Sequence, residues 1–198
     1  MFSAIVSWIV VVGLLITSTG LLLYQDWHWE IGFLAGQYIG VFWLVTQHWP
    51  LGMAAAKLVG GWMPTACIGM TLLNLHPQPE PMETYWTQGR TFRLFMIGMA
   101  ALLAIATAPI IESVLPGIGI PVVIGGILLI AMGLLQLGTT TQVLRVILGL
   151  LTTFSGFEII YAAMEGSSLV AALLIVVNLG LGLVGAYLLV ASPEEKTA

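Results

Sequence analysis

The sequence is poor in charge. Charged residues make up 7% of the chain, and Lys and Arg together number five in 198 residues. Soluble domains carry roughly 25% charged residues, so a chain that is 59% hydrophobic fits only a lipid-embedded fold. Five basic residues also cannot form the clustered patch that nucleic-acid binding requires. We therefore expect an all-α polytopic membrane protein whose surroundings are the lipid bilayer, with no nucleic-acid partner.

Residues that hold redox centres are scarce as well. Cys67 is the single cysteine, which excludes a disulfide, a CxxC motif and iron–sulfur ligation within this chain. His28, His48 and His76 fall near predicted helix ends or loops, so haem held by two intramembrane histidines has no support. A glycine-rich nucleotide loop is also missing. We expect no cofactor or metal and, at most, a non-redox subunit of a translocating oxidoreductase or antiporter complex.

What the chain has in quantity is long apolar runs. Each is close to the roughly 20 residues that cross a ~30 Å hydrocarbon core, and none shows the alternation of a lipid-facing β-barrel. The first run is longer than the roughly 7 to 15 residues of a signal-peptide core, so we interpret it as a retained helix. The predicted spans are 2–23, 31–48, 51–73, 92–111, 118–138, 144–163 and 168–191.

These seven spans divide the chain into three parts: an N-terminal three-helix segment (1–73), a proline-rich loop (74–91) and a C-terminal four-helix segment (92–198). With seven spans, the loop holding Arg90 and Arg93, the loop before Arg145 and the tail with Lys196 all fall on one side. The positive-inside rule makes this side cytoplasmic. We predict an N-terminus outside and a cytoplasmic C-terminus.

Two charges lie deep within predicted helices. Glu158 sits in the apolar run 146–163, and Lys57 lies in the third span. Both are about two turns, or ~10 Å, below the outer surface, so they could form an ion pair. Intramembrane charges are costly and usually face a partner or a water path. The alternatives are a Lys57 side chain that extends outward to the interface and a Glu158 that is a static structural partner.

Two other features of the spans are compatible with a polar path through the membrane, but each also has an ordinary structural explanation. Pro64 predicts a kink or break in the third span just beyond Lys57, although proline is common in membrane helices. Polar residues that could extend a hydrated track, or simply join helices by hydrogen bonds, are Gln37, Gln136, Thr152, Thr153, Ser155 and Asn178.

Small residues recur every four positions and predict faces where helix backbones approach closely. Some of these faces must be internal, and others are available to partner subunits. They are Gly32, Gly36 and Gly40 in the second span, Gly52, Ala56 and Gly60 in the third, and Gly182 and Ala186 in the seventh.

The segment 118–191 resembles a three-helix family that contains the K subunit of bacterial complex I and the C subunit of Mrp-type sodium/proton antiporters. Segments 125–138 and 175–182 resemble its first and third helices. With the extra N-terminal helices, the chain looks like the E component of hydrogenase-4 membrane arms. The matching features of the middle helix are Leu144-Arg145, Gly149-Leu150, Gly156, and Glu158 where the family commonly has asparagine.

This resemblance implies a subunit of a proton- or cation-translocating assembly in a prokaryotic inner membrane, with other membrane subunits as partners. The two membrane glutamates of the complex I subunit fall at Leu151 and Asn178 here, and neither carries a proton at physiological pH. Glu158 lies two turns beyond Leu151 on nearly the same face, so it could take over the carboxylate's task. The alternative is a subunit that has lost relay function and only holds its neighbours.

Three functions therefore remain open. The first is a translocating subunit in which Glu158, with Lys57 and Asn178, forms part of an intramembrane polar axis. The second is a structural membrane subunit without ion traffic. The third is a small free-standing permease acting as a homo-oligomer, against which stands the lack of an evident inverted repeat in the hydropathy.

Overall fold

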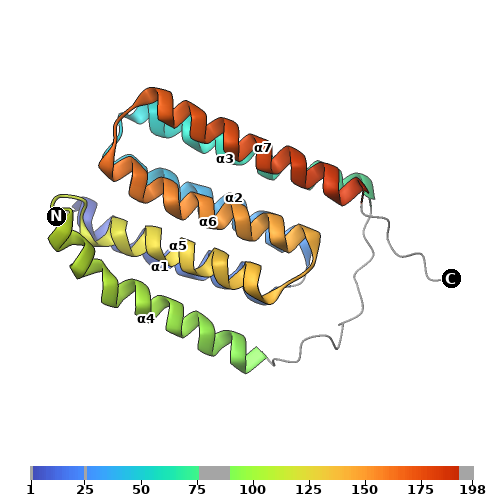
Figure 1. Ribbon diagram of the computed structural model, residues 1–198, viewed down its shortest axis with the longest axis horizontal. Helices are drawn as coiled ribbons and strands as arrows, with labels where there is room; N and C mark the ends of the chain where they lie inside the picture. Colours follow the sequence, from blue (N-terminus) through green and yellow to red (C-terminus); the bar gives the residue numbers. More distant parts are fainter. Residues whose placement is uncertain (1, 25, 76–89, 192–198) are drawn as a thin grey trace.

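The protein is seen here in a computed structural model, which describes residues 2–24, 26–75 and 90–191. These residues form seven α-helices (Figure 1). The helices are α1 (Phe2–Leu23), α2 (Trp27–Val45), α3 (Leu51–Leu75), α4 (Arg90–Val114), α5 (Ile120–Thr139), α6 (Val143–Met164) and α7 (Ser168–Ala191).

The predicted all-α, seven-helix fold is confirmed, and each predicted span corresponds to one helix. The largest difference is at α2, which begins at Trp27 and not at residue 31, so that Glu30 lies inside the helix. The predicted proline-rich loop shortens, because α3 continues to Leu75 and α4 begins at Arg90. Its remainder, 76–89, lies outside the described residues, as does Lys196.

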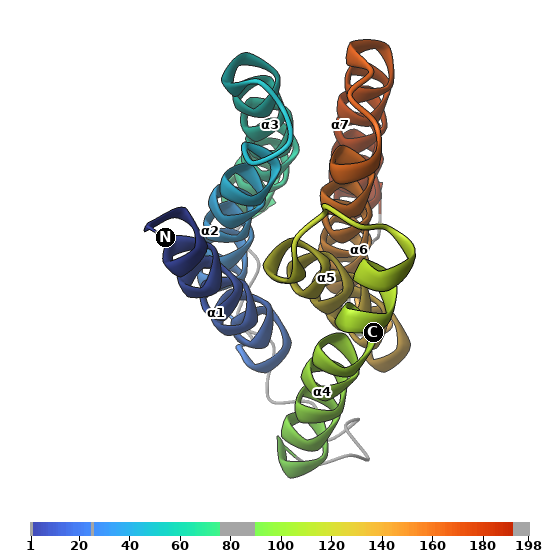
Figure 2. The ribbon, with the colours of Figure 1, turned by 90° about the vertical axis from the view of Figure 1, so that its left-hand side faces the viewer.

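The helices form two layers. One consists of α1, α2 and α3 and the other of α4, α5, α6 and α7, as the two perpendicular views show (Figures 1 and 2). Across the gap between layers α1 contacts α5, α2 contacts α6, and α3 contacts α7. The helix α4 lies at the outer edge against α5, with a minor contact to α1. The interior between the layers is therefore lined by six helices.

Successive helices run in opposite directions (Figure 1), so facing helices of the two layers run in the same direction. The first turns of α4 and α6, which carry Arg90, Arg93 and Arg145, lie at the same end of the bundle as the C-terminus of α1. We call this the basic end. The positive-inside rule predicts that this end faces the cytoplasm.

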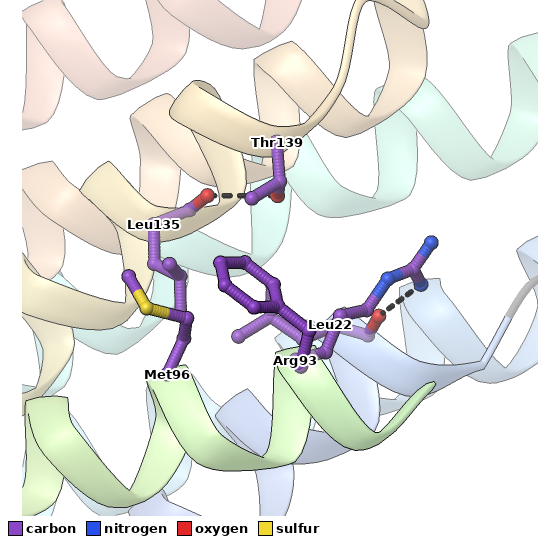
Figure 3. A pocket seen from close by; sticks show the side chains of 6 residues that line it. Leu22, Arg93, Met96, Leu135 and Thr139 are labelled. Carbon is purple, nitrogen blue, oxygen red and sulfur yellow. Dashed lines mark hydrogen bonds between the residues drawn. The ribbon is translucent and has the colours of Figure 1, made fainter. Parts of the chain in front are cut away.

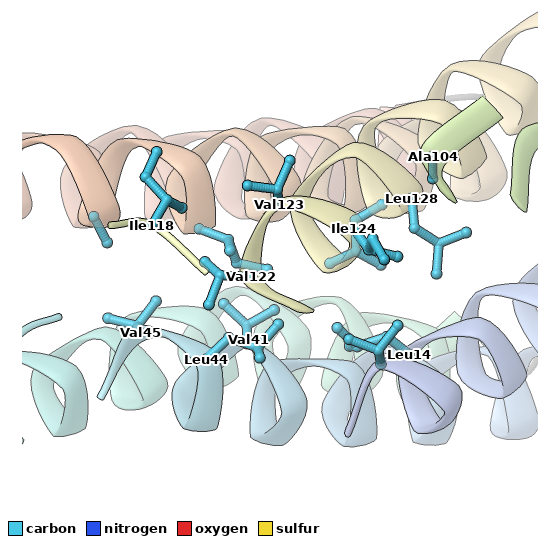
Figure 4. Close-up of a cluster of buried hydrophobic side chains, with 14 of the residues drawn as sticks. Leu14, Val41, Leu44, Val45, Ala104, Ile118, Val122, Val123, Ile124 and Leu128 are labelled. Carbon is cyan, nitrogen blue, oxygen red and sulfur yellow. The ribbon is translucent and has the colours of Figure 1, made fainter. Parts of the chain in front are cut away.

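Apolar side chains fill the space between α1 and α2 on one side and α5 on the other (Figure 4). Leu14 and Leu44 project from the first layer toward Val122 and Leu128 of the second, and all four are almost fully buried. Fully burying a side chain of this size contributes about 1.5–3 kcal/mol in water, but lipid is as apolar as leucine. Here such packing acts mainly through van der Waals contact.

The most extensive helix contact is between α5 and α6, where glycines of the two helices lie at the interface. A Cβ atom built on Gly133 would lie 2.7 Å from the Gly149 carbonyl oxygen, and one on Gly156 would lie 2.7 Å from the Ile130 nitrogen. Only glycine permits backbones to approach this closely. We call this contact, with Gly126, the glycine seam.

The small-residue faces predicted from the sequence contribute unevenly. Gly40 packs against Leu14 and Gly60 against Ile175, as predicted for close contacts. By contrast, a Cβ atom on Gly32 or Gly52 would meet nothing within 4 Å among the described residues. Four-residue spacing therefore did not distinguish buried glycines from those on the outer surface.

Six of the seven helices are long and apolar enough to cross a membrane, and α2 is the exception. Its length, 19 residues, is sufficient, but it carries Glu30, Gln37 and Tyr38. All three are buried, because α2 lies in the middle of its layer and faces α6. The lower hydropathy of α2 therefore comes in part from polar residues that face the protein interior, together with His28 and Trp29 at its exposed first turn.

Candidate functional site

The two intramembrane charges meet between the layers. Lys57 of α3 forms an ion pair with Glu158 of α6, through Nζ and Oε1. Lys57 is 2% exposed and Glu158 1%, so Lys57 does not extend to the interface. The ring of Phe154 lies 5.9 Å from the ammonium nitrogen. The pair is completely enclosed by protein, which increases both its strength and the cost of removing one partner.

Tyr38 of α2 connects this pair to α7. Its hydroxyl donates a hydrogen bond to Asn178 Oδ1 at 3.2 Å, and its ring lies against Gly61, one turn beyond Lys57 on α3. Four helices therefore contribute to one group of buried polar side chains. Asn178, Lys57 and Glu158 are brought together as the sequence suggested, whereas Tyr38 is an addition that sequence reasoning missed.

Gln37 and Thr152 occupy neighbouring positions. Gln37 lies two turns beyond Glu30 on the α2 face that meets α6, and Thr152 lies two turns beyond Arg145 on α6, one turn before Ser155. Both are almost fully buried. Within the described part of the chain, neither side chain has a hydrogen-bond partner. We call the whole group the polar cluster: Gln37, Tyr38, Lys57, Thr152, Ser155, Glu158 and Asn178.

A second buried ion pair lies toward the basic end. Arg145 Nε of α6 is 3.1 Å from Glu30 Oε1 of α2, and Arg145 also donates to the carbonyl of Tyr24 at 3.1 Å. The predicted span 31–48 left Glu30 outside the helix, so this pair was not predicted. A signal was present, because Glu30 lies seven residues before Gln37, two turns along the same helix face.

The two arginines at the basic end also satisfy the C-terminus of α1. Arg93 donates to the carbonyl of Leu22 at 3.0 Å (Figure 3), and Arg145 to that of Tyr24. The last carbonyls of a helix have no intrahelical partner, and cations there oppose the negative end of the helix dipole. Arg93 and Arg145 are therefore explained by helix capping as well as by topology.

Pro64 does not end its helix, since α3 is continuous from Leu51 to Leu75. The helix is therefore not interrupted at Pro64, and the predicted kink stays a prediction. Pro64 is buried and packs against Gly182 of α7, where a Cβ atom would lie 2.7 Å from the Pro64 Cα. Its position is explained by close α3–α7 packing.

The remaining polar candidates separate from the cluster. Thr153 turns toward the glycine seam and donates to its own helix at Gly149 O. Gln136 is buried on α5, a helix that contributes nothing to the polar cluster. Among the residues described, no group of three or more His, Cys, Asp and Glu side chains is placed to hold a metal ion.

Chemically, the polar cluster offers a carboxylate, an ammonium group, a phenol and two amides in a space shielded from lipid. Glu158 Oε2 has no hydrogen-bond partner among the described residues, so one carboxylate oxygen is available to accept a proton. Neither a family model, a curated protein nor a solved structure matches the chain, so this geometry and the sequence motifs are the basis for assigning a function.

Proposed function

We propose that the protein is an integral membrane subunit of a complex I-like or Mrp-like assembly that translocates protons or cations, in a prokaryotic inner membrane. The observation that carries this proposal is the buried Lys57–Glu158 pair inside a polar cluster contributed by four helices. The resemblance of the segment 118–191 to the complex I K and Mrp C subunits supports the same function.

The pair suits proton transfer for a physical reason. Burial favours the neutral form of each side chain, whereas the opposite charge beside it favours the ionised form. The two influences oppose each other, so a small change in surroundings is sufficient to move a proton between ionised and neutral states. Such a change would occur if a charged group on a neighbouring subunit moved toward the ion pair or away from it.

The outer surface of the bundle is suited to subunit contacts and lipid. The edge helix α4 exposes large apolar side chains along its length, and α7 does the same on the side away from α3. These surfaces need lipid or another apolar helix. The exposed side chains include Phe95, Leu102, Leu103 and Ile110 on α4, and Leu173, Val176, Leu183 and Tyr187 on α7.

The test is Glu158→Gln in the intact assembly. This change keeps the shape of the side chain but removes its proton-carrying carboxylate. It also leaves Lys57 buried without its counter-charge, so we expect less assembled complex on native gels. Per molecule of assembled complex, we expect ion pumping in membrane vesicles to fall at least tenfold. Glu165→Gln, at the exposed end of α6, is the control and leaves pumping unchanged. Undiminished pumping in Glu158→Gln would eliminate the proposal.

A structural subunit is the second candidate, favoured by the complete burial of both charges. A permanent pair would hold α3 against α6 without carrying ions. In that case Glu158→Gln lowers the amount of assembled complex, and the remaining complex pumps at the normal rate per molecule. Normalising pumping to assembled complex therefore distinguishes the two functions.

A further inference from the structure

Helices α2 and α6 run side by side in the same direction, and contacts between them set their relative height. Glu30 meets Arg145 toward the basic end, and Leu34 and Leu148, about one turn further along, belong to the same buried apolar cluster. Gln37 lies seven residues after Glu30, and Thr152 lies seven residues after Arg145. At 1.5 Å per residue, both are about 10 Å beyond the ion pair and therefore at the same level.

Five buried polar atoms collect at this level and just beyond it. Among the described residues, none has a hydrogen-bond partner, although all belong to side chains that are at most 1% exposed. Buried polar atoms in native proteins are almost always paired, with ordered water when no protein group is available. The atoms are Gln37 Nε2 and Oε1, Thr152 Oγ1, Asn178 Nδ2 and Glu158 Oε2.

The chemistry of these atoms selects the ligand. Gln37 Nε2 and Asn178 Nδ2 are donors, Gln37 Oε1 and Glu158 Oε2 are acceptors, and the Thr152 hydroxyl serves as either. A metal cation would require acceptors only, and Lys57 would repel it. An anion would require donors only, and Glu158 would repel it. Water both donates and accepts, so it alone matches the set.

We propose that the space around Tyr38, between α2, α6 and α7, is a binding site for internal water that extends from Glu158 to Gln37 and Thr152. The site ends there, because Leu34 and Leu148, both completely buried, lie between it and the Glu30–Arg145 pair. Water binding itself does not depend on the proposed function. A role for this water as a proton relay from Glu158 to mid-membrane, however, rests on the proposed function.

Hydroxyl-radical footprinting by X-ray radiolysis tests the site, using the full chain in lipid nanodiscs. Radicals generated from bound water modify reactive side chains beside it, even when these are buried. Tyr38 and Met132 are both 1% exposed, but Met132 lies in the apolar core of α5. We expect Tyr38 to be modified several-fold faster than Met132, although methionine is intrinsically more reactive. Equal, background-level modification of both would overturn the proposal.

A double variant and a matched control variant provide a second test of the water site. Gln37→Leu combined with Thr152→Val removes the water ligands at mid-membrane and should lower Tyr38 modification at least threefold. Thr65→Val is the matched control, because Thr65 is equally helical and buried but bonds its own helix at Gly61 O. Unchanged Tyr38 modification in a folded double variant would also contradict the site. Should the double variant fail to fold, the Tyr38–Met132 comparison decides the matter in the unaltered protein.

Failure of this proposal and failure of the proposed function are distinguishable. If Tyr38 is modified rapidly while Glu158→Gln pumps normally, the water site stands and the translocating function falls. If Tyr38 stays unmodified while Glu158→Gln abolishes pumping, the function stands and the water site falls.

Discussion

The glycine seam and the polar cluster lie on different faces of the same helix, α6, and hold it by different means. At the seam, Gly149 and Gly156 bring α6 backbone to backbone with α5, and Thr153 satisfies its hydroxyl within its own helix at 2.8 Å. At the polar cluster, Glu158 reaches a lysine on another layer, and several polar atoms have no partner. Thus the polar side chain at the close-packed seam is hydrogen-bonded, whereas several polar atoms of the polar cluster remain able to form hydrogen bonds.

This difference assigns separate tasks to the two faces. In lipid, where leucine gains nothing from leaving the solvent, van der Waals contact between small residues is a main source of helix association. The glycine seam is therefore suited to holding α5 and α6 rigidly together. The contribution of the polar cluster to the free energy of unfolding is harder to predict, because a buried ion pair often stabilises a protein no more than apolar side chains of similar size would. The proposed proton transfer depends on this retained hydrogen-bonding capacity.

The largest expected effect comes from breaking the ion pair on one side. Lys57→Met leaves Glu158 buried without its cation and should lower the free energy of unfolding by about 3–5 kcal/mol. Denaturant titration in lipid–detergent micelles measures the loss. The control is the apolar double variant Lys57→Met with Glu158→Leu, which should recover most of it. A single variant as stable as the double would show that the charges are not coupled.

Overpacking the glycine seam is next in size. Gly133→Ala places a methyl group 2.6 Å from the Thr153 backbone nitrogen, which neither helix can accommodate without moving. We expect a loss of about 1–3 kcal/mol or more in the same titration. The matched control is Gly138→Ala on the same helix, where nothing lies within 4 Å, and stability should stay constant or rise by up to about 1 kcal/mol. Equal effects at both positions would contradict the close contact.

The smallest effect should come from trimming the polar cluster while keeping its charges. Tyr38→Phe removes the hydrogen bond to Asn178, and we expect a loss of about 0.5–1.5 kcal/mol. Tyr187→Phe, on the exposed side of α7, is the control and should leave the unfolding free energy unchanged. If Tyr38→Phe stabilised the protein, the phenol hydroxyl would not contribute to the polar cluster.

The candidate site could be predicted only in part. Glu158, Lys57 and Asn178 stand out because polar groups are rare in apolar runs, and the structure places all three together. Tyr38 did not stand out, since tyrosine is common at membrane interfaces. Glu30 was missed because the apolar run begins after it, and a buried arginine partner on another helix leaves no trace in hydropathy.

From the amino-acid order alone came the number of helices, their alternating direction and the equal depth of Lys57 and Glu158. Hydropathy reports span length, and the rise per residue converts position into depth. Only the tertiary structure decided which face of each helix turns inward. In the tertiary structure Lys57 lies opposite Glu158 and Glu30 pairs with Arg145. Gly133 lies in a close helix contact, whereas Gly32 does not. The reason is that lipid and neighbouring helices are both apolar, so side-chain polarity barely distinguishes an inward face from an outward one.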